Sequence, residues 1–287
     1  MNLSVDKKYT GRKATLADKN NLQQLYENAE NRHVHLDWYY LEERLSKPGF
    51  YLIEDEGDIL AGLAIQPENE TIAWVRFFAS IIPPSKAWDI LWKKLTAEYW
   101  IEPEMAIASL ALERWYAKFL ESKNFQIYDN VVILGWNGDF PQGQIEPVPQ
   151  VKIRELRRED LDSLVKIEEN AFQPVWRLNQ KSVSLLYSHA YYATVILWQD
   201  QIVGYMVSSF DGYNAHLVRI AVLKEMQKKG FGYRLGMDMI NRYVREGYNN
   251  ISVNTQSSNT DSLNLYHRLG FLLTGESFKM MSYKDEK

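Results

Sequence analysis

Apolar positions in the second half of the chain follow two periods in succession. Over 161–168 they recur with helical spacing directly after Asp160, which predicts an amphipathic helix. Further on they form short runs broken by polar turns, a pattern typical of strands in a sheet. The predicted strands lie at 193–198, 202–208 and 216–223, and the first two form a hairpin.

A loop with two glycines and a long helix follow these strands. Apolar side chains recur every four residues from Phe231 to Tyr243, so they form one stripe on a helix predicted over 231–246. The remaining pattern predicts a strand at 250–255, a helix at 260–269 and a strand near 272–281. One helix, three strands and two further helix–strand pairs predict a mixed α/β domain around one central sheet.

The first half repeats the pattern at a nearly constant distance. Asp18 and Asp160 lie 142 residues apart, as do Gly62 and Gly204. Further matches in the same order lie 142, 143 and 146 residues apart: Asn28 with Asn170, Val75 with Val218, and Phe125 with Phe271. Ordered matches with a small drift indicate a duplicated domain rather than a solenoid.

A stretch rich in proline and glycine, PQGQIEPVPQ at 141–150, separates the two copies. Proline and glycine break both helices and central strands, so this stretch is the predicted linker. We therefore expect one domain over residues 1–145 and a second over residues 146–287.

Composition and charge narrow the possible chemistry. Hydrophobic residues are 46% and charged residues 24%, as in ordinary globular proteins. The chain has no cysteine, which excludes disulfides, thiolate metal sites and a cysteine nucleophile. The start is polar, and no apolar run approaches the roughly 20 residues that span a bilayer. We therefore expect a cytoplasmic protein without a membrane partner.

The net charge of −4 gives no general attraction to nucleic acid, so no nucleic-acid partner is expected. The net charge is −6 over residues 1–145 and +2 over residues 146–287. This difference is either chance surface variation or the sign of an anionic ligand in the second half.

The residues that could bind a ligand lie where the third predicted strand runs into the glycine loop. Gly230 and Gly232 allow a close approach of backbone and ligand, and the next helical turn offers unpaired N–H groups at a positive dipole end. Lys228, Lys229 and Arg234 add positive charge. The loop lacks the endings of a P-loop and the spacing of a Rossmann fingerprint. It predicts either a pyrophosphate cradle or a tightly packed helix start.

Two motifs decide between these interpretations. The loop resembles the Q/R-x-x-G-x-G/A motif of the GCN5-related N-acetyltransferases (GNAT), and the preceding Ile220-Ala221-Val222 is similar to that family's hydrophobic strand. Downstream, the segment from Asn259 to Phe271 resembles the family's second acyl-CoA motif, N…LY…GF. The resemblance covers about residues 151–287, and the repeat extends it to 12–140. It implies two tandem GNAT-like domains, each with a mixed, mostly antiparallel central sheet flanked by helices.

The resemblance implies an N-acetyltransferase that uses acetyl-CoA as cosubstrate and an amine as acceptor. It assigns the strand edge of Ile220, Ala221, Val222 and Leu223 to the pantetheine arm, with the N–H of Ala221 or Val222 on the thioester carbonyl. Asn259 is expected to cap its helix, contact the CoA arm, or both. Backbone N–H groups of six successive residues are expected to bind the pyrophosphate: Gln227, Lys228, Lys229, Gly230, Phe231 and Gly232.

Proton transfer has two candidates. Tyr266 is the expected general acid for the departing CoA thiolate, the alternative being a packed aromatic. His216 occupies the place where family members often carry a glutamate base, the alternative being a structural histidine. Glu168, Glu169 and Asp211 are further candidates for the base.

The first copy departs from the motif. Pro83 and Pro84 replace the glycine loop and remove N–H donors, so we expect no productive CoA binding there. This copy either supports the second or helps to bind substrate. His33 and His35 have metal-like spacing but no third ligand, and no metal site is expected.

Three alternatives stay open at this point. The second copy could be a non-catalytic acyl-CoA-binding module, used as a sensor or assembly part. The acyl group could be longer than acetyl. The strand edges allow a homodimer without requiring one.

Overall fold

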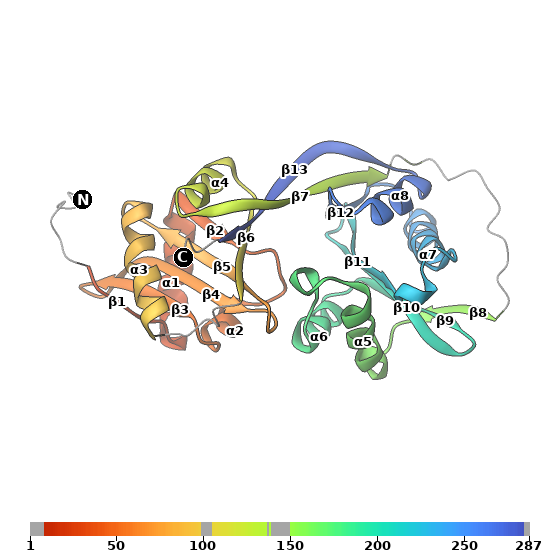
Figure 1. The fold of residues 1–287 in the computed structure, drawn as a ribbon, viewed down its shortest axis with the longest axis horizontal. Helices are drawn as coiled ribbons and strands as arrows, with labels where there is room; N and C mark the ends of the chain where they lie inside the picture. Colours follow the sequence, from red (N-terminus) through yellow and green to blue (C-terminus); the bar gives the residue numbers. More distant parts are fainter. Residues whose placement is uncertain (1–8, 99–104, 137, 139–149, 284–287) are drawn as a thin grey trace. The chain divides into compact units, whose positions relative to one another are not determined.

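The computed structural model describes residues 9–98, 105–136, 138 and 150–283 and divides the chain into two units (Figure 1). The first unit combines the residues up to Tyr128 with those from Lys279 onward, and the second unit is Asp129–Phe278. The predicted linker at 141–150 lies outside the described residues except for Gln150, so the boundary between residues 145 and 146 stays a prediction.

The second unit is built around a mixed β-sheet. Its strands follow the order β7-β12-β11-β10-β9-β8, and all neighbours are antiparallel except the parallel pair β11 and β12. The strands are β7 (Phe125–Trp136), β8 (Val151–Glu155), β9 (Tyr192–Trp198), β10 (Gln201–Phe210), β11 (Ala215–Val222) and β12 (Ile251–Gln256). The helices are α5 (Leu161–Ala171), α6 (Gln180–Ser188), α7 (Phe231–Arg245) and α8 (Thr260–Arg268). The predicted elements of this copy are confirmed to within a few residues, whereas β8 and α6 were not predicted.

The first unit repeats this plan. Its sheet follows the order β1-β3-β4-β5-β6-β13, with β5 and β6 parallel and β2 added to β5. The strands are β1 (Gly11–Lys13), β2 (Asn31–Val34), β3 (Phe50–Asp55), β4 (Asp58–Pro67), β5 (Ile72–Ser80), β6 (Ala106–Ala111) and β13 (Phe271–Tyr283). The helices are α1 (Lys19–Asn28), α2 (Leu41–Leu45), α3 (Pro84–Glu98) and α4 (Arg114–Glu121).

Each unit is completed by a strand from the other half of the sequence. β7 begins in the first unit, and its later residues pair with β12, placing Leu134 and Trp136 in the core of the second unit. β13 begins in the second unit, and its last residues pair with β6, placing Met281 in the core of the first unit. Neither half of the sequence therefore contains all of its own core.

Matching residues of the two copies make the same contacts. Arg12 holds both carboxylate oxygens of Asp18, at 2.8 and 2.9 Å, and Arg154 holds those of Asp160 at 2.7 and 2.8 Å. Both pairs lie at the start of the first helix, 142 residues apart. The duplication inferred from the sequence is thus visible in individual ion pairs.

Asp18 gives a prediction of pH-dependent stability. Hydrogen bonds from Arg12 lower the pKa of Asp18 to about 2. The folded state prefers the carboxylate, so this contribution is complete above the ordinary pKa of 3.8 and is lost as the pH falls toward 2. Asp18→Asn should cost about 2 kcal/mol of unfolding free energy at pH 7 and much less near pH 2. Urea unfolding at both pH values measures this, and an equal loss at both would contradict the assignment.

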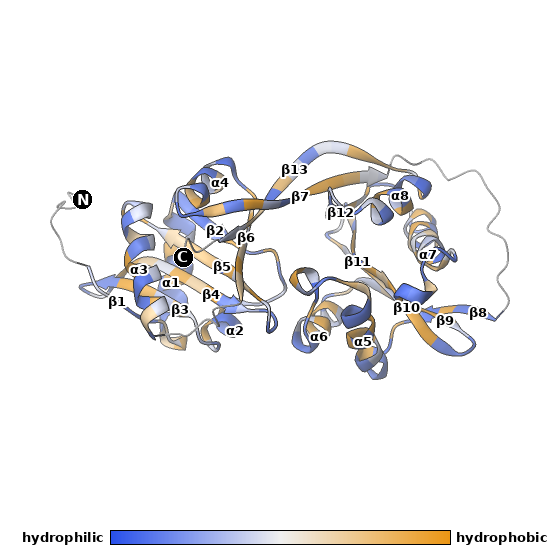
Figure 2. Ribbon diagram, viewed as in Figure 1, coloured by the Kyte–Doolittle hydropathy of each residue, from blue (hydrophilic) through white to orange (hydrophobic). Residues whose placement is uncertain are grey.

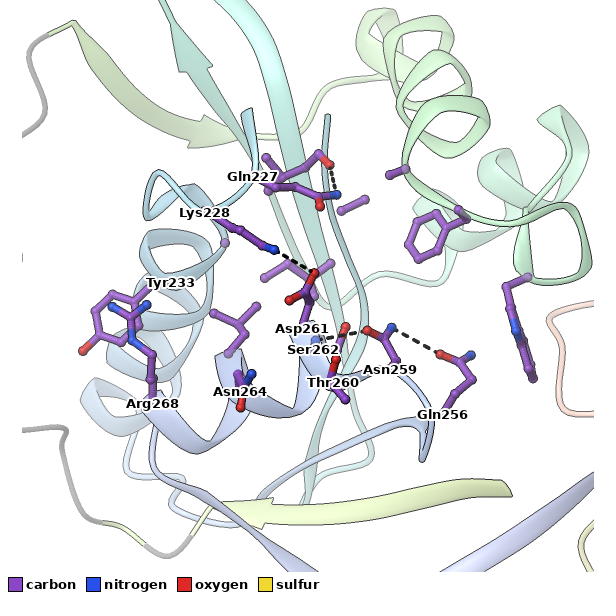
Figure 3. Close-up of a pocket in the computed structure, with 18 of the residues that line it drawn as sticks. Gln227, Lys228, Tyr233, Gln256, Asn259, Thr260, Asp261, Ser262, Asn264 and Arg268 are labelled. Atoms are coloured by element: carbon purple, nitrogen blue, oxygen red, sulfur yellow. Dashed lines mark hydrogen bonds and ion pairs between the residues drawn. The ribbon is translucent and has the colours of Figure 1, made fainter. Parts of the chain in front are cut away.

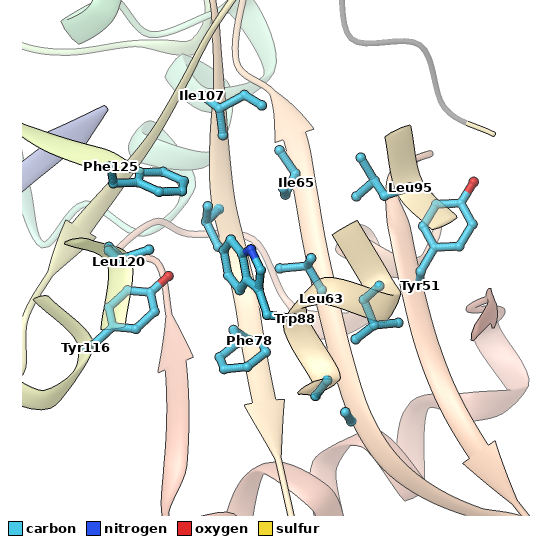
Figure 4. Packing of buried hydrophobic residues seen from close by; sticks show 14 of the residues in the cluster. Tyr51, Leu63, Ile65, Phe78, Trp88, Leu95, Ile107, Tyr116, Leu120 and Phe125 are labelled. Carbon is cyan, nitrogen blue, oxygen red and sulfur yellow. The ribbon is translucent and has the colours of Figure 1, made fainter. Parts of the chain in front are cut away.

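Aromatic residues fill the core of the first unit (Figure 4). The Trp88 ring meets that of Phe78 edge-on at a centroid distance of 5.3 Å and stacks on that of Trp92 at 5.6 Å. Figure 2 shows hydrophobic residues concentrated along the central strands of both sheets. Trp88 and Trp92 therefore help to fill the core of the first unit. None of the described helices is long and apolar enough to cross a membrane.

Candidate functional site

A cavity of about 690 Å³ lies in the second unit where β11 and β12 separate (Figure 3). The two strands pair only from Ala215 to Leu217, opposite Ile251 to Val253. Beyond that point Ile220, Ala221 and Val222 line the cavity from β11. The edge of β11 that faces β12 is therefore open along the cavity, while its other edge stays paired to β10.

The open edge leads into the glycine loop. Lys228 has φ of +60° and Gly230, which caps α7, has φ of +83°. Left-handed residues in such a loop turn successive N–H groups toward one concave side, which suits an anion. Backbone bonding of the helix starts with the N–H of Arg234 on the oxygen of Gly230, so the first turn offers its N–H groups to a ligand.

Helix α8 forms the opposite wall. Asp261, Asn264, Leu265 and Arg268 line the cavity with the spacing of one helical face. Asn259 caps this helix, its Oδ1 accepting the N–H of Ser262 at 3.1 Å, and it lines the cavity as well. The predicted cap is confirmed, and contact with a CoA arm stays a prediction.

Gly232 has a packing role besides its place in the loop. A Cβ on Gly232 would lie 3.2 Å from Leu265 Cδ2, and one on Gly236 would lie 2.4 Å from Leu269 Cδ1. Both glycines therefore let α7 and α8 approach closely. The packing explanation of the glycine pair holds for Gly232, whereas nothing lies within 4 Å of a Cβ on Gly230.

Cationic side chains surround the loop end of the cavity. The Lys228 Nζ lies 3.6 Å from Asp261 Oδ2, an exposed pair that leaves the lysine free to turn (Figure 3). Arg268 lies over the ring of Tyr233, 5.2 Å from its centroid, and both residues line the cavity. The loop end therefore combines fixed N–H donors with two cations, the environment of an anionic ligand.

Another part of the cavity wall consists of residues that the sequence did not single out. Phe172, Gln173 and Trp176 line the cavity from the segment between α5 and α6, and Gln256 does so from the end of β12. No motif marks these four. The helical spacing on α8, by contrast, could have revealed Asn264 and Arg268.

Two sequence comparisons place the chain among known proteins. The model of the acetyltransferase (GNAT) family matches residues 153–271. An uncharacterized N-acetyltransferase of Methanocaldococcus jannaschii is 30% identical over 124 residues, which are 42% of this chain and 76% of that protein. This chain belongs to the GNAT family. The uncharacterized N-acetyltransferase YvbK of Bacillus subtilis is 34% identical over 73 residues, 25% of this chain and 47% of YvbK.

Solved structures extend the GNAT fold over both copies. A GCN5-related N-acetyltransferase from Sphaerobacter thermophilus has a TM-score of 0.61 at 13% identity, covering 97% of this chain and 96% of that one. A tandem GNAT protein from the clavulanic acid biosynthesis pathway has a TM-score of 0.61 at 11% identity, with coverage of 96% and 97%. The prediction of two tandem GNAT-like domains is thereby confirmed. GNAT proteins use an acyl-CoA, so acyl transfer is the general reaction of this chain.

Five residues assigned from the GNAT motifs do not line the cavity with the others. Phe231 is 2% exposed and its ring belongs to the core of the second unit. The N–H of Leu223 donates to Val203 on β10, so it is not on the open edge. Lys229 lies with its Nζ 3.7 Å from the sulfur of Met226. Tyr266 and His216 are the remaining two.

Tyr266 is a buried residue of α8, 5% exposed, with its ring edge-on to Phe271. Burial raises the pKa of its phenol, and the nearby Arg219 charge opposes the rise. The phenol is therefore protonated at neutral pH, as a proton donor must be. Its role as general acid stays a prediction.

His216 lies at the start of β11 and does not line the cavity. Its Nδ1 is 2.9 Å from Ser252 Oγ and its Nε2 is 3.0 Å from Asn254 Oδ1. Burial lowers its pKa, so the ring is neutral at pH 7. Both nitrogens have partners on β12, which fits the structural interpretation, and a role as base stays a prediction.

In the described part of the first unit, the strand edge that matches the open edge of β11 is paired. β5 stops pairing with β6 at Trp74, which matches Leu217, but β2 then pairs with β5 over Phe77 to Ser80. These four residues match Ile220 to Leu223. β5 leads past Pro83 into α3, which begins at Pro84 without a glycine loop. The first copy thus lacks the glycine-loop motif, and the adjacent edge of its strand β5 is paired with β2.

Of the two histidines with metal-like spacing, His33 belongs to this filling strand, and His35 follows its last residue, Val34. The His33 ring stacks on Tyr116 at 4.3 Å, its Nε2 lies 3.2 Å from the oxygen of Val75, and burial lowers its pKa to about 3. His35 is buried against Trp74, with ring centroids 4.7 Å apart. Within the described residues, no three His, Cys, Asp or Glu side chains group as a metal site requires.

Proposed function

We propose that this chain transfers an acetyl group from acetyl-CoA to an amine by direct attack in a ternary complex, at the cavity of the second unit. The observation that carries the proposal is the open edge of β11, which is followed, after a 3₁₀ turn at Lys224–Met226, by the glycine loop and the N-terminus of α7. A pantetheine arm can pair with the edge as a strand would, which brings the pyrophosphate to the loop. The two anchors lie in the order in which acetyl-CoA presents its parts.

The same edge supplies a donor for the thioester carbonyl. Alternate residues of a strand direct their N–H groups to opposite edges. The N–H of Leu223 points to β10, so that of Ala221 does too, and that of Val222 points to the open edge. The oxygen of Val222 accepts a hydrogen bond from Gln227 Nε2 at 3.0 Å, so it too points away from β10. Of the two candidates, the Val222 N–H is the oxyanion donor in this proposal.

The reaction proceeds in two stages. The amine nitrogen attacks the thioester carbon and forms a tetrahedral intermediate whose oxyanion accepts the Val222 N–H. The amine proton leaves to a base or through water, and the C–S bond breaks as the carbonyl re-forms. The thiolate takes a proton from the Tyr266 phenol, and the proton released by the amine restores the phenol through solvent, so the products are the amide and CoA thiol.

Acetyl-CoA turnover on the full chain tests this proposal. We expect CoA thiol to appear only when acetyl-CoA and a suitable primary amine from a panel are both present, with the acetylated amine detected by mass spectrometry. Binding of CoA without turnover of any amine would support the non-catalytic module instead. Faster turnover of a longer acyl-CoA would correct the acyl group but not the site. The cytoplasmic location and the homodimer stay predictions.

A further inference from the structure

A buried ion pair in the second unit is not used by the proposed reaction. Glu168 of α5 is 0% exposed, and its Oε1 accepts Nε of Arg219 at 2.9 Å. A second guanidinium nitrogen of Arg219 pairs with Oε2, and the hydroxyl of Tyr205 donates to Oε1. Burial alone would lower the pKa of Arg219, but the neighbouring Glu168 raises it, so the guanidinium stays charged. A buried pair of this kind costs desolvation, and its full satisfaction indicates a specific role.

The pair holds the segment between α5 and α6, residues 172–179. Arg219 donates to the oxygen of Trp176 at 2.7 Å, and its guanidinium lies 3.6 Å from the ring centroid of Phe172. The Oε2 of Glu168 accepts the N–H of Leu178 at 2.9 Å. The same segment contributes Phe172, Gln173 and Trp176 to the cavity. The ion pair thus contacts Phe172, Trp176 and Leu178 in a cavity wall that is not part of the β-sheet.

The first unit shows what the matching segment does without this pair. With the 142-residue offset, residues 173–176 match 31–34, which form β2 and fill the edge of β5. Tyr26 stands in the place of Glu168. Arg76, which matches Arg219, pairs instead with Asp37 and Glu68 at 2.7 and 2.6 Å.

In the second unit the matching residues form a 3₁₀ turn, Pro174–Trp176, and leave the edge of β11 open. Pro174 replaces Arg32 of β2 and lacks the N–H that a strand ladder would use. The two copies therefore carry one segment in two placements, and the matching arginines, Arg76 and Arg219, have different partners.

We propose that Glu168 and Arg219 form a latch that holds residues 172–179 off the edge of β11 and so keeps the acyl-CoA groove open. They are positioning residues, and the latch rests on the proposed function for its effect on CoA. Without the latch the segment is free to fall toward the open edge, as its counterpart does on β5. CoA then has to displace it, which lowers the apparent affinity.

Glu168→Gln tests the latch because it keeps the side-chain shape and removes the charge. Asp160→Asn is the matched control: it breaks an ion pair of the same unit that touches neither the segment nor the cavity. We expect Glu168→Gln to raise the Kd for CoA about tenfold by calorimetry, and the control to change it less than about twofold. Amide exchange of ligand-free protein should become about tenfold faster in 172–179 for Glu168→Gln alone.

Unchanged exchange in 172–179 would overturn the latch. Faster exchange with an unchanged Kd would overturn its role in keeping the groove open. If Glu168→Gln does not fold, Arg219→Lys serves the same test, because lysine keeps the charge but loses the fork that reaches Trp176. If the unaltered chain binds no CoA, the proposed function fails, while the exchange experiment still decides whether the latch exists.

Discussion

Gly230→Asp should weaken CoA binding about 100-fold or more. Gly230 has φ of +83°, a backbone conformation that costs another residue about 1–2 kcal/mol. The new carboxylate would also stand at the N-terminus of α7, where the pyrophosphate is proposed to bind, and would repel it. Together these effects reach about 3 kcal/mol, and each 1.4 kcal/mol is tenfold in affinity.

Gly212→Asp is the matched control for this prediction. Gly212 also has positive φ, at +98°, and no atom lies within 4 Å of a Cβ there either. It lies in the turn between β10 and β11 and does not line the cavity. Calorimetry should find CoA binding to this variant unchanged. An equal loss in both variants would mean that backbone strain, and not the loop, governs binding.

Tyr266→Phe should lower kcat about 100-fold while the Kd for CoA changes little. The phenol is the proposed donor to the CoA thiolate, and general acid catalysis contributes about 10²–10⁴-fold. Phenylalanine keeps the ring that packs on Phe271. The control is Tyr116→Phe, a buried tyrosine of α4 in the first unit, whose hydroxyl lies 3.1 Å from Ser109 Oγ and outside the proposed site. A kcat within about twofold of normal in Tyr266→Phe would leave Tyr266 a packed aromatic.

The pH dependence of kcat follows from the same assignment. A general acid must be protonated, so kcat falls as the pH rises through its pKa. Burial raises the pKa of Tyr266, which moves that fall above the ordinary phenol value of 10. We therefore expect kcat of the unaltered enzyme to show no loss from this group below pH 10. A fall between pH 8 and 9 that disappears in Tyr266→Phe would contradict the raised pKa.

The loop and its flanking strand could be predicted because their chemistry is local. Gly230 takes a left-handed conformation that its own residue type permits, and β11 and α7 follow from short-range periodicity. The repeat of 142 residues likewise predicted a second copy of the same domain. These features depend on residues close together in the sequence.

The missed features depend on distant partners. Glu168 and Arg219 are 51 residues apart, and only their contact shows that residues 172–179 form a cavity wall. The pattern of β7 predicts a strand but does not say that Leu134 enters the core of the second unit. The filling of β5 by β2 is equally invisible, since a four-residue strand carries a weak pattern. Partner choice in a sheet is a tertiary property.

Calorimetry of CoA on the full chain tests the central claim most directly. The full chain is required because residues 129–136 complete the sheet of the second unit, so a fragment that starts at residue 146 would lack Leu134 and Trp136. We predict saturable binding of one CoA per chain, because among the described residues the edge of β11 is open and its counterpart on β5 is paired with β2. A folded chain that gives no heat with CoA or acetyl-CoA, or that binds two per chain, would contradict it.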